Sequence, residues 1–259
     1  MTNEKIKEIL LSLENTDTDF TVIQTGKVSK KVNGLYTPAT FEILLHDKNF
    51  NTENDLIFVA IHEYTHHLIN CKQKKLGIEA KNGGKSHTTE FWAKFDDLLE
   101  KAIESKIYIK KRPEELSSLI DKAKEIDCEI VNMKRNFGKL VTKIFEKAYE
   151  EKIRDFNILR DLNITYKTYD KCWFSNLIDG NFGQDEMELL LKTEDFKTRQ
   201  NVINSLKKGK TINQVSAAIK KDKNLSQYEK LTKEKARLEK TIQHLEERLE
   251  IVSETLSSI

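Results

Sequence analysis

Two histidines and a glutamate stand at a spacing that suits metal chemistry: His62, Glu63 and His66 lie within the segment VAIHEYTHHLI. On a helix, residues four apart share one face, so both imidazoles can reach a single zinc ion at about 2.0–2.1 Å. Glu63 is rotated by roughly 100° from His62, which directs its carboxylate beside a metal-bound water rather than at the metal. Zinc lowers the pKa of such a water towards about 7, and a carboxylate can take its proton and pass it to a leaving amine. The segment therefore predicts a zinc hydrolase with two histidine ligands and a glutamate base.

A catalytic zinc site needs a third protein ligand and one open coordination position. The downstream segment SHTTEFWAKF offers His87 and Glu90, both near the start of a second expected helix. We expect His87 to be the ligand, because Gly83 and Gly84 just before it give the backbone freedom to bring it to the metal. Glu90 is the alternative, either as the ligand itself or as an acceptor for the ring N–H of a ligand histidine.

The other histidines are expected to take different roles. His67 adjoins His66 but points about 100° away on a helix, which favours a surface position or a hydrogen bond to a ligand. His46 ends a strand-like run and could approach the site, although a plain surface position is favoured. His244 lies in a C-terminal heptad segment and is expected to be solvated.

The sequence before the metal motif predicts one short helix and a set of strands. Apolar residues at helical spacing indicate an amphipathic helix over 4–13. The pattern then changes, and 20–29 and 32–46 are typical of strands, with Asn33-Gly34 as a hairpin turn signal.

The metal motif itself is expected on a capped helix over 53–70. Thr52 and Asp55 form a capping-box pattern in front of it, and an apolar run directly precedes the motif. A second helix is expected to start near residue 86 and to run past residue 99. These elements predict a small α+β domain that occupies residues 1–112.

At this point the residues resemble a known family. A strand, then VAIHEYTHHL, then a single downstream histidine followed by Phe91-Trp92 resembles the YgjP-like and SprT-like minimal zinc metallopeptidases, over roughly residues 20–105. The resemblance implies a compact zincin-like α+β core, a peptide or protein substrate, and packing roles for Phe91 and Trp92. Carried over residue by residue, it makes His62, His66 and His87 the zinc ligands and Glu63 the base.

The chain also departs from that family. The loop between His66 and His87 is long, and the cysteine zinc ribbon that many SprT-like proteins carry is absent, because three isolated cysteines cannot build it. The DNA-linked substrates of the family are therefore in doubt here. Extended substrates of such enzymes pair with an edge strand beside the metal helix, and Phe41–Leu45 resembles that strand, with an ordinary buried strand as the alternative.

Long heptad helices are expected to follow the α+β domain. Apolar residues recur at spacings of three and four over 113–151 and again over 223–259, as in coiled coils. Each segment would be roughly 57 Å long at 1.5 Å per residue. The two could pair as an antiparallel hairpin or could bind another chain, and a solvated scaffold is the alternative. Residues 152–222 between them are expected to form a small, partly helical module.

Within this module, residues 197–221 loosely resemble a helix-turn-helix motif. One helix would end at Gly209 and another would start near Ile212. The signal is weak, so nucleic acid is only a secondary candidate partner. The lysines that could contact phosphates are Lys207, Lys208, Lys210, Lys220 and Lys221.

The composition excludes some classes of protein. The formal net charge of +2 gives no general case for nucleic acid or acidic membranes. No apolar run is long enough for a membrane helix, and three widely separated cysteines favour a reducing cytoplasm.

Two functions remain after these exclusions. The first is a zinc metallopeptidase with a helical appendage for a substrate or partner. The alternative is a coiled-coil interaction protein with a structural or inactive zinc site, which could associate with DNA.

Overall fold

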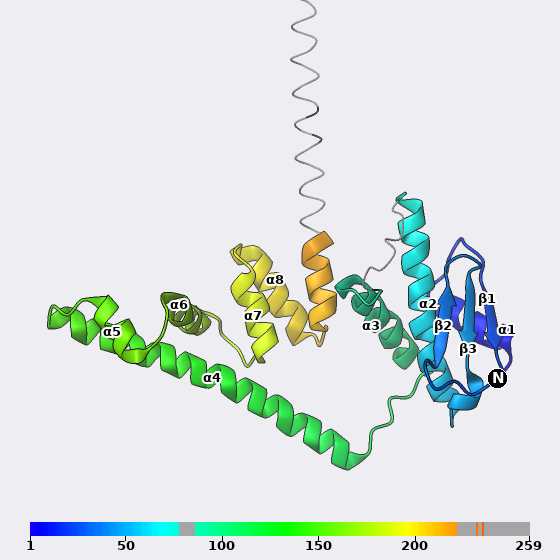
Figure 1. Cartoon of the computed structure of the whole chain (residues 1–259), viewed down its shortest axis with the longest axis horizontal. Helices are drawn as coiled ribbons and strands as arrows, with labels where there is room; N and C mark the ends of the chain where they lie inside the picture. The colour runs from blue at the N-terminus through cyan, green and yellow to red at the C-terminus, as the bar shows by residue number, and fades with distance from the viewer. Residues whose placement is uncertain (78–85, 222–231, 233–234, 236–259) are drawn as a thin grey trace, which may run out of the picture. The chain divides into compact units, whose positions relative to one another are not determined.

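The computed structural model describes residues 1–77, 86–221, 232 and 235, and the chain divides into the units Met1–Val215 and Ser216–Ile259 (Figure 1). The first unit contains three helices and a three-stranded sheet, followed by a run of further helices. The expected α+β class is therefore confirmed. Each helix in the described part of the chain is too short or too polar to cross a membrane.

The sheet has the strand order β1-β3-β2. β1 spans Thr21–Gln24, β2 spans Gly34–Thr37 and β3 spans Glu42–Leu45. β3 runs parallel to β1 and antiparallel to β2, so it is the central strand. All three strands fall inside the two segments in which strands were expected.

The hairpin turn expected at Asn33-Gly34 is wrong. Gly34 is already the first residue of β2, and the carbonyl of Asn33 accepts the backbone amide of His46, which continues the pairing with β3. The chain reverses at 38–41 instead, where Phe41 adopts a φ of 55°. Pro38 cannot donate to a strand ladder, which places the turn directly after β2.

Three helices surround the sheet: α1 at Asn3–Leu13, α2 at Glu53–Lys75 and α3 at Thr89–Glu104. The expected capping of α2 is confirmed, because the Thr52 side chain accepts the backbone amide of Asp55, the third residue of the helix. Thr88 caps α3 in the same way. α2 continues beyond residue 70, where the sequence pattern predicted its end, and its last turn is rich in lysine.

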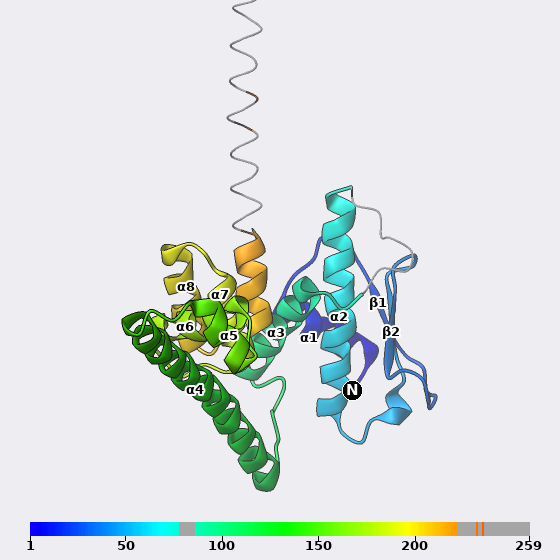
Figure 2. The same cartoon turned by 60° about the vertical axis from the view of Figure 1, so that its left-hand side comes forward.

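One apolar core holds these elements together. α1 packs against β1, α2 packs against β2 and β3, and α3 packs against α2 (Figure 2). α2 is therefore held between the sheet and α3, and both of these faces of the helix are covered. Fully buried core side chains include Ile6, Leu10, Ile43, Leu45, Ile61, Phe91 and Leu98.

Helices make up the rest of the described chain. They are α4 at Glu114–Glu150, α5 at Asp155–Leu162, α6 at Tyr166–Phe174, α7 at Gln184–Lys192, α8 at Phe196–Lys207, and a last helical stretch at 212–221. Short 3-10 turns lie at Asp47–Asn49 and Ser175–Leu177. α5, α6 and α7 all pack against α4.

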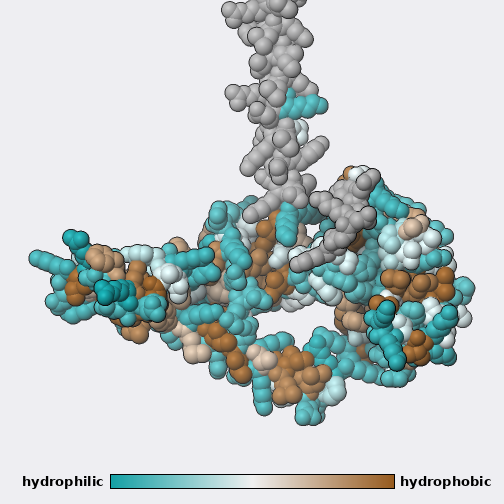
Figure 3. Space-filling model, viewed as in Figure 1, coloured by the Kyte–Doolittle hydropathy of each residue, from teal (hydrophilic) through white to brown (hydrophobic). Residues whose placement is uncertain are grey.

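The apolar residues at the predicted heptad positions, which we call the seam, are largely exposed on α4. The apolar residues that α4 does bury, Val131, Val141 and Ala148, are not seam residues. Figure 3 shows hydrophobic surface along this helix. The second predicted seam, over 223–259, lies outside the described residues apart from 232 and 235, so the pairing of the two remains a prediction. The exposed seam residues are Leu116, Leu119, Ile126, Met133 and Leu140.

Candidate metal centre

The three histidines proposed as ligands come together in the structure. His62 and His66 stand one turn apart on α2, and His87 lies just before α3. The Nε2 atom of His87 is 3.0 Å from Nε2 of His62 and 3.2 Å from Nε2 of His66. In the described residues these three form the one group of ligating side chains whose donor atoms lie within 4.8 Å of one another.

These distances suit a tetrahedral ion. Metal–nitrogen bonds of about 2.0–2.1 Å at tetrahedral angles separate neighbouring nitrogens by roughly 3.3–3.4 Å. The observed separations of 3.0 and 3.2 Å are close to this value. Small side-chain rotations would therefore be enough to bind zinc, and His87, rather than Glu90, is the side chain that joins His62 and His66.

Aromatic side chains pack against the imidazoles. The buried Phe91 ring has its centroid 4.3 Å from the His66 ring and 4.7 Å from the His87 ring, while Trp92 stacks on His87 at 5.5 Å. The packing roles expected for both residues are observed. Burial, helped by the charge of His87, lowers the pKa of His62 to about 4, and burial does the same for His66. The imidazoles of His62 and His66 are therefore neutral near pH 7, as ligands must be.

The side chain of Glu63 lies against β2. Its side chain is 7% exposed, and burial raises its pKa to about 7, although a hydrogen bond from the Tyr36 backbone amide opposes this shift. Gly34 lies directly against it: a Cβ built on Gly34 would be 2.8 Å from Cγ and 2.9 Å from Oε1 of Glu63. The Glu63 carboxylate can therefore lie this close to β2 only because residue 34 has no side chain.

The edge strand beside the metal helix is β2, and the prediction of Phe41–Leu45 for this role is wrong. Those residues include β3, which is paired on both sides and has no free edge. The apolar character that marked the segment reflects its central, buried position. The Asn33 carbonyl accepts the amide of His46, at the end of β3. In an antiparallel ladder, successive residues point their backbone N–H and C=O groups alternately towards and away from the partner strand. The backbone groups of Gly34 and Tyr36 therefore point away from β3.

The remaining candidate residues lie elsewhere. Glu90 forms an ion pair with Lys72 and does not belong to the histidine group. His46 hydrogen-bonds the Thr25 hydroxyl through Nδ1 at 2.9 Å, so it has a local role beside the sheet. His244 lies outside the described residues.

The surface position expected for His67 is wrong, since this side chain is fully buried. Its ring lies 3.2 Å from the Tyr36 hydroxyl through Nδ1 and 3.2 Å from the Thr18 carbonyl through Nε2. The rotation of 100° from His66 therefore turns it towards β2 and the core, because α2 is covered on that side.

Sequence reasoning missed the part of β2 that faces Glu63. Gly34 was interpreted as a turn residue, and Tyr36 and Asn70 were given no role. The hydroxyl of Tyr36 accepts a hydrogen bond from Asn70 at 2.9 Å. Asn70 is seven residues beyond Glu63 on one helix face, and this spacing is the signal that could have identified it.

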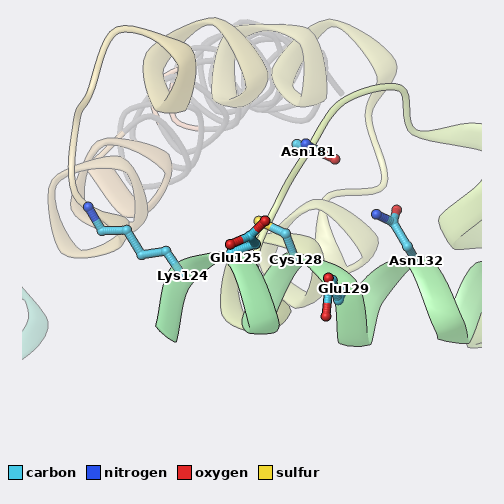
Figure 4. A pocket seen from close by; sticks show the side chains of 6 residues that line it. All are labelled: Lys124, Glu125, Cys128, Glu129, Asn132 and Asn181. Carbon is cyan, nitrogen blue, oxygen red and sulfur yellow. The ribbon is translucent and has the colours of Figure 1, made fainter. Parts of the chain in front are cut away.

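Two hollows occur on the helical part of the first unit. One, of about 390 Å³, is lined by α4 residues on one side and Asn181 on the other (Figure 4). A second, of about 1000 Å³, lies between α4, α6 and α7 and is lined partly by Met133, Phe174 and Met187. Neither contains the histidine group, which lies in the α+β part of the unit. The residues labelled in the smaller hollow are Lys124, Glu125, Cys128, Glu129, Asn132 and Asn181.

The segment that resembles a helix-turn-helix motif contains helices at the expected places, α8 and 212–221. Lys210 between them is held by Glu100, with Nζ 2.6 Å from the carboxylate oxygen. One of the five lysines expected to contact phosphates is thus paired with an acid. DNA binding remains a prediction.

Comparison with protein-family models, with curated proteins and with solved structures finds no match for this chain. A function must therefore be inferred from its own residues.

Proposed function

We propose that this chain is a zinc-dependent metallopeptidase with a zincin-like domain, in which His62, His66 and His87 hold the metal and Glu63 is the general base. The observation that carries the proposal is the convergence of the three Nε2 atoms, two of them from α2, the helix that also carries the buried carboxylate of Glu63. Structural zinc is usually held by four protein ligands, and catalytic zinc by three with one open position. In the described residues no fourth ligating side chain joins the three histidines, which supports a catalytic site.

The donor set fits zinc. Zinc bound by these nitrogens would polarise a peptide carbonyl and lower the pKa of a water molecule towards about 7. His62 and His66 are already neutral near pH 7, so they need not lose protons to bind it. Phe91 covers the imidazoles from behind and limits their rotation.

Glu63 supplies the proton transfers. It takes a proton from the attacking water as the new carbon–oxygen bond forms, and gives that proton to the nitrogen as the carbon–nitrogen bond breaks. Burial raises its pKa to about 7 in the metal-free chain. A group that titrates near neutral pH can both accept and return a proton at little cost, which suits this double role.

The free edge of β2 supports a peptide substrate. In the part of the chain that the structure describes, this strand is bonded to β3 on one side only, and Gly34 lies against Glu63 of α2. An extended peptide could pair with this edge through backbone hydrogen bonds, which do not depend on its sequence. Leu35, 48% exposed, offers an apolar contact on the same strand.

The exposed seam of α4 supports a binding role for the helical part. Apolar residues at heptad spacing in water are costly unless another helix covers them. We propose that a coiled-coil partner, from this chain or from another protein, covers them and delivers the peptidase to its target. The same seam is the observation that favours the second candidate function, an interaction protein with an inactive zinc site.

Metal content tests the assignment of the site. The wild-type protein should bind one zinc per chain, and His87→Ala should lose it. Glu90→Gln is the matched control from the same segment, and it should keep zinc because its carboxylate pairs with Lys72 instead. Elemental analysis of the three purified proteins is sufficient. Full zinc in His87→Ala would overturn the assignment.

A further inference from the structure

α2 presents a second row of polar side chains beside its metal-binding face. Glu63, His67 and Asn70 follow at spacings of four and three, so they lie on one side of the helix, facing β2. All three are buried, at 7%, 0% and 9% exposure. Burying a polar group without a hydrogen-bond partner destabilises the folded state, so the partners of these three side chains must be identified.

Two residues of β2 contact this row. The Tyr36 hydroxyl accepts a hydrogen bond from Asn70 Nδ2 at 2.9 Å and lies 3.2 Å from Nδ1 of His67. Its ring meets the His67 ring edge-on, with 5.5 Å between the centroids. Gly34, two residues earlier on the same strand, lies directly against the side chain of Glu63. Tyr36 therefore holds β2 to α2 next to the place where the strand contacts Glu63.

The directions of these hydrogen bonds follow from the partners. Nε2 of His67 faces the Thr18 carbonyl at 3.2 Å, and a carbonyl can only accept, so Nε2 carries the ring proton. Nδ1 is then an acceptor, and the Tyr36 hydroxyl donates to it while accepting from Asn70. Both functions of the hydroxyl are used, so the network determines a single orientation of Tyr36.

This network matters because β2 is an edge strand. β3 holds it on one side, and on the other side its backbone groups have no strand partner among the described residues. The part of β2 that contacts Glu63 would therefore be free to move away from α2, unless the side chain of Tyr36 is fixed to the helix.

We propose that Tyr36 is a positioning residue for Glu63: its hydroxyl, held by His67 and Asn70, fixes β2 against α2, and Gly34 of that strand then holds the carboxylate in place. This inference rests on the function proposed above. The hydrogen bonds among Tyr36, His67 and Asn70 then assist the reaction through Glu63, although none of these three residues is a proposed metal ligand.

The test compares two Tyr→Phe variants that each remove one hydroxyl. Tyr36→Phe removes the hydroxyl of the network. Tyr64→Phe is the control, because Tyr64 is also fully buried on α2 but donates to the Glu14 carbonyl at 2.6 Å, away from Glu63. Glu63→Gln is the reference for complete loss of the carboxylate. All are loaded with cobalt(II) in place of zinc, and the midpoint of the visible absorption change is measured against pH.

We expect Glu63→Gln to shift this midpoint, and Tyr36→Phe to shift it in the same direction by a smaller amount at full cobalt content. Tyr64→Phe should titrate like the wild type. In a peptide hydrolysis assay, Tyr36→Phe should lower kcat by roughly tenfold with little change in KM, because it misplaces the base rather than the substrate.

A wild-type midpoint in Tyr36→Phe, with a shifted midpoint in Glu63→Gln, would overturn this inference and leave the proposed function standing. Failure of the wild type to bind cobalt, or an unshifted midpoint in Glu63→Gln, would overturn the proposed function and this inference with it. If Tyr36→Phe does not fold, Asn70→Ala removes one partner of the hydroxyl and must produce the same direction of shift.

Discussion

Adding one methyl group at Gly34 should damage the reaction without removing the metal. A Cβ there would lie 2.8 Å from Cγ of Glu63 and 2.8 Å from Cγ1 of Val59, whereas ordinary contacts begin near 3.4 Å. The neighbours must therefore move by at least 0.6 Å. A general base works within about 2.6–3.2 Å of the proton it takes, and a misplacement of 1 Å can cost about 10²-fold in rate. We expect Gly34→Ala to lose about 10–10²-fold in kcat and to keep one zinc per chain.

A double-mutant cycle shows whether this loss passes through Glu63. Hydrolysis of a fluorogenic peptide mixture is measured for the wild type, Gly34→Ala, Glu63→Gln and the double variant. If the methyl group acts by displacing the carboxylate, it should have little further effect once the carboxylate is gone. Equal losses from Gly34→Ala in both backgrounds would refute this reasoning and indicate general damage, which overpacking can also cause at about 1–3 kcal/mol.

Two further predictions concern stability. Burial would raise the pKa of Glu14, but hydrogen bonds and charges from Lys94 and Lys101 outweigh it and lower the pKa below 4.5. Ionised Glu14 therefore stabilises the fold above that pH and ceases to do so as the pH falls through the lowered value. Urea unfolding should show Glu14→Gln about 1 kcal/mol less stable than wild type at pH 7, with the difference shrinking as the pH falls through the lowered pKa; a constant difference would contradict the ion pairs. Limited proteolysis should cut beyond Arg112 before it cuts within 86–105, and early cuts there would argue against a folded α+β domain.

The convergence of the three histidines could be predicted because it depends mainly on local structure. His62 and His66 need only one helix, and the helical period follows from the residues around them. His87 directly precedes the next helix, and the packing of α3 against α2 brings it to the same place. The capping residue Thr52 also acts within a few residues of its own position.

The environment of Glu63 could not be predicted, because it depends on contacts between distant segments. The order of strands is decided by long-range pairing, and the most apolar strand, Glu42–Leu45, proved to be the centre of the sheet rather than its edge. Because β2 and the core also cover the side of α2 that carries His67, this residue is buried, although the helical pattern alone places it near solvent. Gly34 illustrates the same point: its local signal is a turn, but its role is close contact with another element.

The most direct test of the proposed function is the rate of peptide hydrolysis by zinc-loaded Glu63→Gln compared with the wild type. The substitution keeps the size of the side chain and leaves His62, His66 and His87 in place, so both proteins should carry one zinc per chain. The substituted protein lacks the base, and we expect its rate to be lower by about 10²–10⁴-fold. If wild type and Glu63→Gln, both with full zinc, cleave the peptides equally fast, Glu63 is not the base and the proposed mechanism is wrong.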